Sequence, residues 1–322
     1  MDNLKSLYTF SNRLFEELLL DNEEANLKRI EAKFNVKLCV KDSSVFILEP
    51  KDYKLNKKLS CILQTYDILL ANKIDISVSD FCSLLNNIDE ANYKEVENIY
   101  LNKLIILNTQ SGKSIYPRTL NQKIYINALN KNDVIFALGP AGTGKTYLAV
   151  MYALRALKLG VIKKIVLVRP VVEAGEKLGF LPGDLKEKID PYLVPLYDAL
   201  YEGLGKEAVD RYLEKGIIEV APLAYMRGRT LENALIILDE AQNANLTQMK
   251  MFLTRLGFNS KMIITGDITQ IDLPNKMQSG LIEATNILGD IKGIKIIRFS
   301  NEDVMRHPLV FEIIKRYEEE GK

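Results

Sequence analysis

The 322-residue sequence contains no tryptophan, a single histidine and only three cysteines. Cys39, Cys61 and Cys82 lie far apart and form no C-x-x-C pair, so together with His307 they do not supply the ligands of a zinc cluster. The spacing gives no disulfide framework either. We expect reduced, mostly buried thiols, as in a cytoplasmic protein.

The sequence also lacks long apolar runs and a marked excess of either charge. No apolar stretch approaches the ~20 residues that span a bilayer, and residues 1–10 lack the apolar core of a secretory signal. We therefore expect a cytoplasmic protein with no membrane partner. Lys and Arg number 43 against 42 Asp and Glu, which gives a net charge of +1. A wholly basic coat is excluded, so any RNA or DNA site must be a local patch.

A chain of this length, with 47% hydrophobic and 26% charged residues, is typical of a globular protein of about two domains. We place the boundary near residue 108. Residues 1–107 predict a small α+β domain in which helices flank two strands joined by a turn. This outline resembles a KH-type RNA-binding fold, but no GXXG clamp precedes Lys28-Arg29. A packing or oligomerisation domain is the alternative.

Residues 134–146, VIFALGPAGTGKT, predict a strand, a phosphate-binding loop and the start of a helix that continues through residues 147–160. Glycines let the backbone N–H groups turn around phosphate oxygens, and the lysine reaches the β- and γ-phosphates. The alternative, a glycine-rich turn without a ligand, is disfavoured by the strand before and the helix after. The predicted nucleotide-binding residues are Gly139, Pro140, Ala141, Gly142, Thr143, Gly144, Lys145 and Thr146, with Thr146 also holding Mg²⁺.

A second motif, LIILDE, ends a buried strand in Asp239 and Glu240. The first carboxylate is placed to hold Mg²⁺ and the second to polarise the attacking water. A helix-capping aspartate at an ordinary strand end is the alternative. Further on, the strand in KMIITGD is followed by Gln270, whose side chain could contact the γ-phosphate or the attacking water and pass the nucleotide state onward.

Three further features are less specific. Gln122 precedes a short helical segment and could read an adenine edge, although surface glutamines are far commoner. Arg169 ends a second buried strand, where open α/β sheets carry their ligand chemistry. Residues 171–216 predict an insertion with a Gly-rich loop and helical runs interrupted by Pro191 and Pro195, of the length that is usually functional.

The alternation of strands and helices over residues 108–322 predicts a parallel sheet flanked by helices. Glu directly after the strand-end Asp points to a RecA-like P-loop fold. Monomeric helicases bind ATP between two such cores, but only one fits here, so we infer that an arginine finger comes from a neighbouring copy in a homo-oligomer, such as a ring. The candidate arginines are Arg227, Arg229 and Arg306.

Eight stretches together resemble bacterial PhoH-like ATPases over nearly all of residues 116–311. They are GPAGTGKTYLAV, VRPVVEAGEKLGFLPGD, DPYLVPLYDAL, APLAYMRGRTL, ILDEAQN, MKMFLTRLG, TGDITQIDLP and RHPLV. The resemblance implies an ATPase related to superfamily 1 helicase cores, with a role in RNA metabolism and partnership with an endoribonuclease of ribosomal RNA maturation. It implies ATP and Mg²⁺ as cofactors and these roles: Gln122 on adenine, Lys145 and Thr146 on phosphate and Mg²⁺, Asp239 and Glu240 on metal and water, Gln270 in coupling.

Two functions follow as alternatives. The first is an RNA-stimulated ATPase or helicase, with the loop at 173–183 and the turn at Arg227 and Arg229 contacting single-stranded RNA. The second is a nucleotide-gated scaffold that binds a ribosome-assembly partner and releases it on hydrolysis. A small-molecule phosphotransferase is disfavoured, because Glu240 suits water activation and the sequence suggests no acceptor pocket.

Overall fold

The computed structural model describes residues 5–48, 52–102, 104–170, 185–273, 278–305, 309, 310, 313, 316 and 317. It divides into two compact units, Met1–Lys103 with Arg118–Ile124, and Leu104–Pro117 with Tyr125–Lys322. The chain therefore passes between the units more than once, instead of at a single boundary near residue 108. The reason is hydrophobic: Leu120 is buried in the core of the first unit and Ile124 packs against that core.

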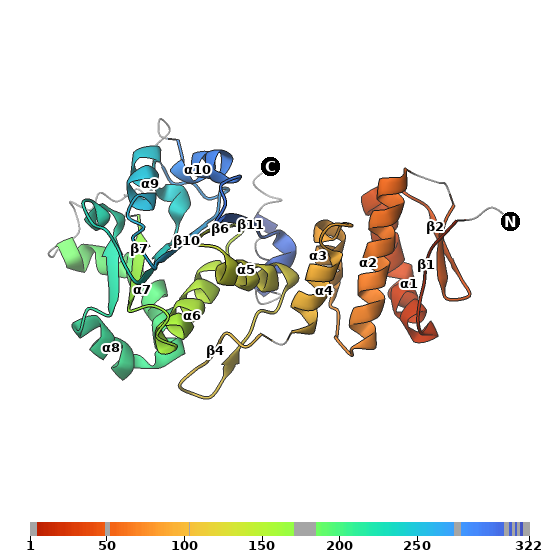
Figure 1. Ribbon diagram of the computed structural model, residues 1–322, viewed down its shortest axis with the longest axis horizontal. Helices are drawn as coiled ribbons and strands as arrows, with labels where there is room; N and C mark the ends of the chain where they lie inside the picture. Colours follow the sequence, from red (N-terminus) through yellow and green to blue (C-terminus); the bar gives the residue numbers. More distant parts are fainter. Residues whose placement is uncertain are drawn as a thin grey trace. The chain divides into compact units, whose positions relative to one another are not determined.

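The first unit combines a three-stranded antiparallel sheet, in the order β1-β3-β2, with four helices. The long helices α1 and α2 lie beside the sheet (Figure 1). The elements are β1 (Lys5–Thr9), α1 (Arg13–Phe34), β2 (Leu38–Lys41), β3 (Ser44–Ile47), α2 (Tyr53–Ala71), α3 (Val78–Asn87) and α4 (Tyr93–Leu101). The predicted strand–turn–strand pair is confirmed as β2 and β3. The edge strand β1 was not predicted, because its pairing with β3 spans a large sequence separation.

A buried aspartate connects β1 to α2 in this unit. Asp67 is 3% exposed and accepts hydrogen bonds from the Tyr8 hydroxyl at 2.7 Å and the Ser11 hydroxyl at 3.0 Å. The backbone N–H of Ser11 also points at the carboxylate. Burial, and then the bond to Asp67, raise the pKa of Tyr8, so its hydroxyl stays a donor.

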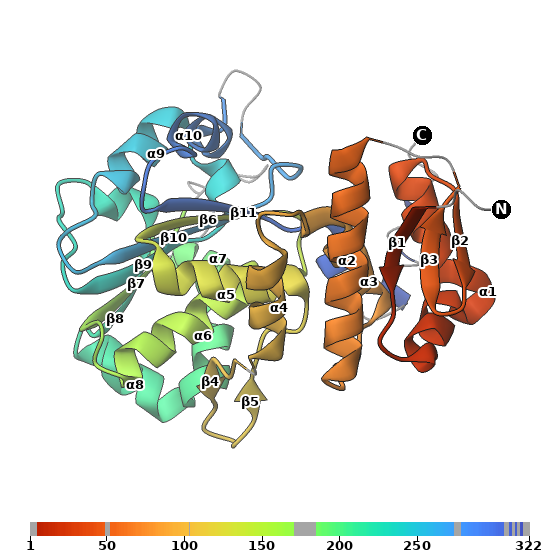
Figure 2. The same ribbon diagram turned by 45° about the vertical axis from the view of Figure 1, so that its right-hand side comes forward.

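The second unit is built on a six-stranded sheet in the order β11-β6-β10-β9-β7-β8, in which every neighbouring pair is parallel (Figure 2). The strands are β6 (Val134–Leu138), β7 (Lys164–Arg169), β8 (Ile218–Pro222), β9 (Ala234–Leu238), β10 (Lys261–Gly266) and β11 (Ile294–Arg298). β6 and β9 are buried at every position, as expected for strands covered on both faces. Because β10 separates β6 from β9, the predicted RecA-like arrangement is confirmed.

Helices cover both faces of this sheet. Figure 2 shows α9 (Leu246–Leu253) and α10 (Gly280–Leu288) on one face and α6 (Lys145–Lys158) on the other. The remaining elements are the hairpin β4 (Leu107–Asn108) and β5 (Ser114–Ile115), α5 (Leu120–Lys131), α7 (Leu185–Leu204), α8 (Lys206–Glu214) and the short helices η2 (Leu223–Met226), η3 (Ala241–Asn243) and η4 (Asn301–Asp303). None of the helices in the described ranges is long and apolar enough to cross a membrane.

The insertion predicted between β7 and β8 is in part an ordinary crossover between adjacent parallel strands. Its helices α7 and α8 pack on each other and on these strands. The expected interruption at Pro191 and Pro195 is wrong, because α7 runs without a break through both. The predicted Gly-rich loop, residues 171–183, lies outside the described residues. The last helix, predicted from about Pro308, is described only at five positions, all helical.

Candidate nucleotide-binding site

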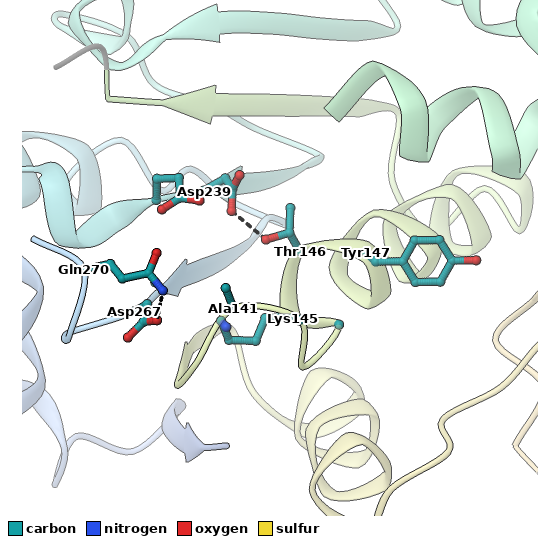
Figure 3. A pocket seen from close by; sticks show the side chains of 11 residues that line it. Ala141, Lys145, Thr146, Tyr147, Asp239, Asp267 and Gln270 are labelled. Carbon is teal, nitrogen blue, oxygen red and sulfur yellow. Dashed lines mark hydrogen bonds between the residues drawn. The ribbon is translucent and has the colours of Figure 1, made fainter. Parts of the chain in front are cut away.

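Three strand ends bring polar residues to one edge of the sheet. The carboxyl ends of parallel strands meet at the same edge, so the segments after β6, β9 and β10 surround one pocket of about 250 Å³ (Figure 3). Its lining is Ala141, Gly142, Gly144, Lys145, Thr146, Tyr147, Asp239, Glu240, Gly266, Asp267 and Gln270. The structure thus brings the predicted phosphate loop, both predicted carboxylates and Gln270 together.

Glycine is required in the phosphate loop on conformational grounds. Gly142 and Gly144 have φ of 85° and 79°, and Gly139 has φ of 146°. Residues that carry a Cβ rarely adopt these values. A Cβ on Gly139 would also lie 2.6 Å from the carbonyl oxygen of Phe299. The N–H of Gly139 donates to the carbonyl of Gly266 at 3.1 Å. The loop is therefore held between β10 and the residue that follows β11.

Lys145 is the first residue of α6, and its side chain folds back onto the phosphate loop. Its Nζ donates to the carbonyls of Gly139 and Pro140, both at 2.7 Å, and to the Thr143 hydroxyl at 3.1 Å. The buried Tyr125 hydroxyl donates to the Lys145 carbonyl at 3.4 Å. The ammonium and the positive end of α6 face the same pocket, which makes it an anion site.

Asp239 follows β9 and is 6% exposed. Its Oδ1 accepts from the Thr146 hydroxyl at 2.5 Å and from the Thr265 hydroxyl at 2.8 Å, and Figure 3 shows the first of these bonds. A carboxylate beside hydroxyls is the oxygen donor set that Mg²⁺ prefers, so these residues fit the ion. Thr265 was not predicted, because the alternation of side chains along MIITG places it on the same face of β10 as the apolar Ile263.

Glu240 lines the pocket with a backbone φ of 52°. Its Oε2 accepts from Gln242 Nε2 at 2.6 Å, and its Oε1 lies 3.0 Å from a terminal guanidinium nitrogen of Arg169. Arg169 Nε is 3.9 Å from Asp239 Oδ2. Sequence analysis placed Arg169 at the correct edge without giving it a role, and it did not single out Gln242. The pairing depends on β7 and β9 being neighbours in the sheet.

A hydrogen-bond path connects Glu240 to Gln270. Gln242 Oε1 accepts from the Asp267 N–H at 3.0 Å, and Gln270 Nε2 donates to Asp267 Oδ2 at 2.8 Å (Figure 3). Thr269 fixes the other oxygen of Asp267 through its N–H and hydroxyl. The polar groups on the pocket wall after β9 and β10 therefore form one network.

Comparison with known proteins agrees with this geometry. The model of the family described as "PhoH-like protein" matches residues 114–318. This chain belongs to the PhoH-like family. It is 48% identical over 304 residues to a PhoH-like protein of Bacillus subtilis (strain 168), covering 94% of each chain. It is 47% identical over 311 residues to one of Mycobacterium tuberculosis (strain ATCC 25618 / H37Rv), covering 94% of this chain and 86% of that one.

Protein PhoH of Escherichia coli (strain K12) is 46% identical over 212 residues, 65% of this chain and 60% of its own. A solved structure, "Sulfolobus solfataricus SWI2/SNF2 ATPase core in complex with dsDNA", superposes with a TM-score of 0.35 at 16% identity over 62% of this chain and 47% of that one, a likeness too slight to bear on function. Membership of the PhoH-like family and the P-loop ATPase-like fold support nucleotide hydrolysis.

The remaining predicted residues lie elsewhere in this PhoH-like chain. Gln122 belongs to the segment grouped with the first unit, where its Oε1 accepts from the Arg118 N–H at 2.8 Å, and its adenine role stays a prediction. Arg229 forms a two-point ion pair with Glu219, at 2.6 and 2.8 Å. Arg227 is exposed, and neither arginine is among the residues that line the pocket. Arg306 lies outside the described residues.

Proposed function

We propose that this protein hydrolyses ATP with Mg²⁺ and couples hydrolysis to RNA metabolism, as an RNA-stimulated, helicase-like ATPase. The observation that carries the proposal is the meeting of Lys145, Thr146, Asp239 and Glu240 at one pocket. A lysine with loop N–H groups suits phosphate, and a carboxylate placed beside the metal-binding pair suits water activation. A protein that only binds nucleotide needs no general base. The presence of Glu240 at the pocket therefore favours ATP hydrolysis.

Each side chain has a distinct part in the proposed reaction. Lys145 and the loop N–H groups hold the β- and γ-phosphates, and Thr146 and Asp239 would hold Mg²⁺, which would neutralise the charge that develops on the leaving ADP. Glu240 accepts the proton of the attacking water. Gln270, in the segment after β10, donates toward the γ-phosphate or the water and transmits the loss of the phosphate through Asp267.

Coupling to RNA is supported by η2 and the turn that follows it. Tyr225 is 54% exposed, Arg227 is also exposed, and Gly228 has φ of 76°. An exposed aromatic ring beside a cation suits base stacking and phosphate contact with single-stranded RNA. Arg229 is less available for this, because Glu219 holds it. The predicted second contact, residues 173–183, lies outside the described residues.

The test is ATP turnover of wild type, Lys145→Ala and Glu240→Gln, with Lys163→Ala as the control. Lys163 is an exposed residue directly before β7, at the opposite end of the sheet from the pocket. We expect Lys145→Ala to lose ATP binding and turnover together, and Glu240→Gln to bind ATP while turnover falls by ~10²–10⁴-fold. Normal hydrolysis by Glu240→Gln would overturn the assignment of the base. A wild-type rate unchanged by single-stranded RNA would count against RNA coupling.

The hydrogen-bond path from Glu240 to Gln270 favours a second candidate, a nucleotide-gated scaffold. In it, loss of the γ-phosphate shifts the Asp267–Gln270 turn and releases a protein partner, such as an rRNA-maturation endoribonuclease. Capture of that partner by ATP-loaded Glu240→Gln but not by ADP-loaded wild type, without RNA stimulation of turnover, would select this function over the first.

We also propose that turnover requires a homo-oligomer, because a single P-loop core supplies only one wall of a RecA-like site. Arg227 is the described candidate for an arginine that completes a neighbour's site. Mixing Arg227→Ala with Glu240→Gln should restore part of the activity that each variant lacks, since mixed contacts join an intact site to an intact arginine. Full activity at concentrations where mass measurement shows only monomer would contradict the proposal.

A further inference from the structure

Arg169 is placed to act on the catalytic edge although it does not line the pocket. It ends β7, whose preceding residues Lys164–Val168 pair with Ala234–Leu238 of β9, so Arg169 lies next to the residues that follow β9. The side chain is 19% exposed. Its guanidinium reaches Glu240 Oε1 at 3.0 Å, while its Nε is 3.9 Å from Asp239 Oδ2.

Glu240 needs such support for two reasons. Its backbone occupies the left-handed region, at φ 52°, which non-glycine residues adopt uncommonly and at a cost in strain. Its carboxylate also adjoins that of Asp239, and like charges in sequence repel. Arg169 lies beside both carboxylates. Gln242 Nε2 donates to the other oxygen of Glu240 at 2.6 Å. Each carboxylate oxygen keeps a further lone pair for water.

We propose that Arg169 is a positioning residue for Glu240. With Gln242 it fixes the carboxylate on both sides, so that the remaining lone pairs face the nucleotide pocket. A role in phosphate binding is not favoured, because Asp239 and Glu240 line the pocket while Arg169 is absent from the described lining. The inference rests on the proposed role of Glu240 as the base.

Arg169→Lys is the conservative variant for the test, because it removes the planar guanidinium and keeps the charge. Lysine retains the charge but offers a single point donor, so it cannot hold Glu240 and approach Asp239 with the same geometry. Arg169→Lys should therefore recover part of what Arg169→Ala loses. A suitable control is Arg211→Ala, because Arg211 is an exposed arginine on α8.

The experiment measures kcat, KM and affinity for a non-hydrolysable ATP analogue in Arg169→Ala, Arg169→Lys, Glu240→Gln and the double variant Arg169→Ala/Glu240→Gln. We expect Arg169→Ala to lower kcat by about 10- to 100-fold, as a misplaced catalytic group does, with KM and analogue affinity within about 3-fold. In the Glu240→Gln background the same change should lower the residual rate by less than about 2-fold, because the group that Arg169 positions is gone.

Three outcomes would overturn the inference: faster turnover in Arg169→Ala, a loss of analogue affinity that matches the loss of kcat, or an undiminished effect of Arg169→Ala in the Glu240→Gln background. If Arg169→Ala does not fold, Arg169→Lys at the wild-type rate would also overturn it. A wild-type rate in Glu240→Gln alone would instead refute the proposed base, so the two failures are distinguishable.

Discussion

Asp67 in the first unit and Asp239 in the second are both nearly buried aspartates, 3% and 6% exposed, and both accept bonds from hydroxyl groups. Their surroundings differ. Asp67 is enclosed by neutral donors from the start of the chain, Tyr8 and Ser11. Asp239 forms one wall of a pocket that also holds Lys145, and Arg169 lies behind it.

A structural carboxylate can be distinguished from a functional one by the groups that surround it. Burial alone does not distinguish them, because both residues are hidden and both have partners. A carboxylate enclosed by neutral donors stabilises the connection between elements. One that faces an open polar pocket, beside a cation and a second carboxylate, retains the capacity to bind an ion. Replacing the two residues should therefore affect different quantities.

The largest expected effect is on turnover in Asp239→Asn. The change removes the charge that would hold Mg²⁺ and keeps the shape, so we expect ATP hydrolysis to fall by ~10²–10³-fold. The free energy of unfolding should change by less than about 1 kcal/mol, since Thr146 and Thr265 keep an oxygen acceptor. Urea unfolding and steady-state kinetics check both numbers. Near-normal turnover, or a loss of stability like that of an Asp67 variant, would show that Asp239 is a structural carboxylate.

The second effect is on stability in Asp67→Ala. It leaves the Tyr8 and Ser11 donors without their acceptor, which costs about 2–3 kcal/mol of the free energy of unfolding. Turnover per folded molecule should stay within about 2-fold of wild type. Asp75→Ala is the matched control, because Asp75 is exposed. A loss of turnover under conditions where Asp67→Ala is fully folded would show that Asp67 is more than structural.

A third carboxylate, Glu219 on β8, extends the comparison, because it is held by the cations Arg229 and Lys164 and is not among the residues that line the pocket. The bond from Arg229, and then that from Lys164, lower the pKa of Glu219 from 4.5 to about 2. Its stabilising contribution is therefore complete above pH ~5 and is lost as the pH falls toward 2. After allowance for its partial exposure we expect about 1–2 kcal/mol more acid destabilisation in wild type than in Glu219→Gln. Parallel stability curves between pH 5 and 2.5 would refute this.

The smallest effect comes from removing one hydroxyl group that donates a hydrogen bond to each aspartate. Tyr8→Phe should cost about 1 kcal/mol of stability and leave turnover unchanged. Thr265→Val is the nearly isosteric counterpart beside Asp239, and it should lower turnover by about 3- to 10-fold, the equivalent of one lost hydrogen bond. If both variants changed stability alone, Thr265 would belong with the structural residues.

Much of the site could be predicted because its residues are close in sequence or sit at strand ends. GPAGTGKT carries its own glycines, lysine and threonine, and the apolar run before Asp239 indicates a buried strand. Arg169 and Thr265 were harder to assign, because each acts across the sheet on a carboxylate from another strand. The uninterrupted α7 shows a further limit, since packing overrode the helix-breaking tendency of Pro191 and Pro195.

The chemical groups of the site and their local setting can be read from the sequence: a glycine loop that ends in lysine and threonine, and a carboxylate pair after an apolar strand. These depend on short-range geometry, which a few consecutive residues specify. The pairing of β7 with β9, and the contact of a β10 side chain with Asp239, become visible only in the folded sheet. Strand order depends on packing between residues far apart in the chain, and it places Arg169 on Glu240 and Thr265 on Asp239.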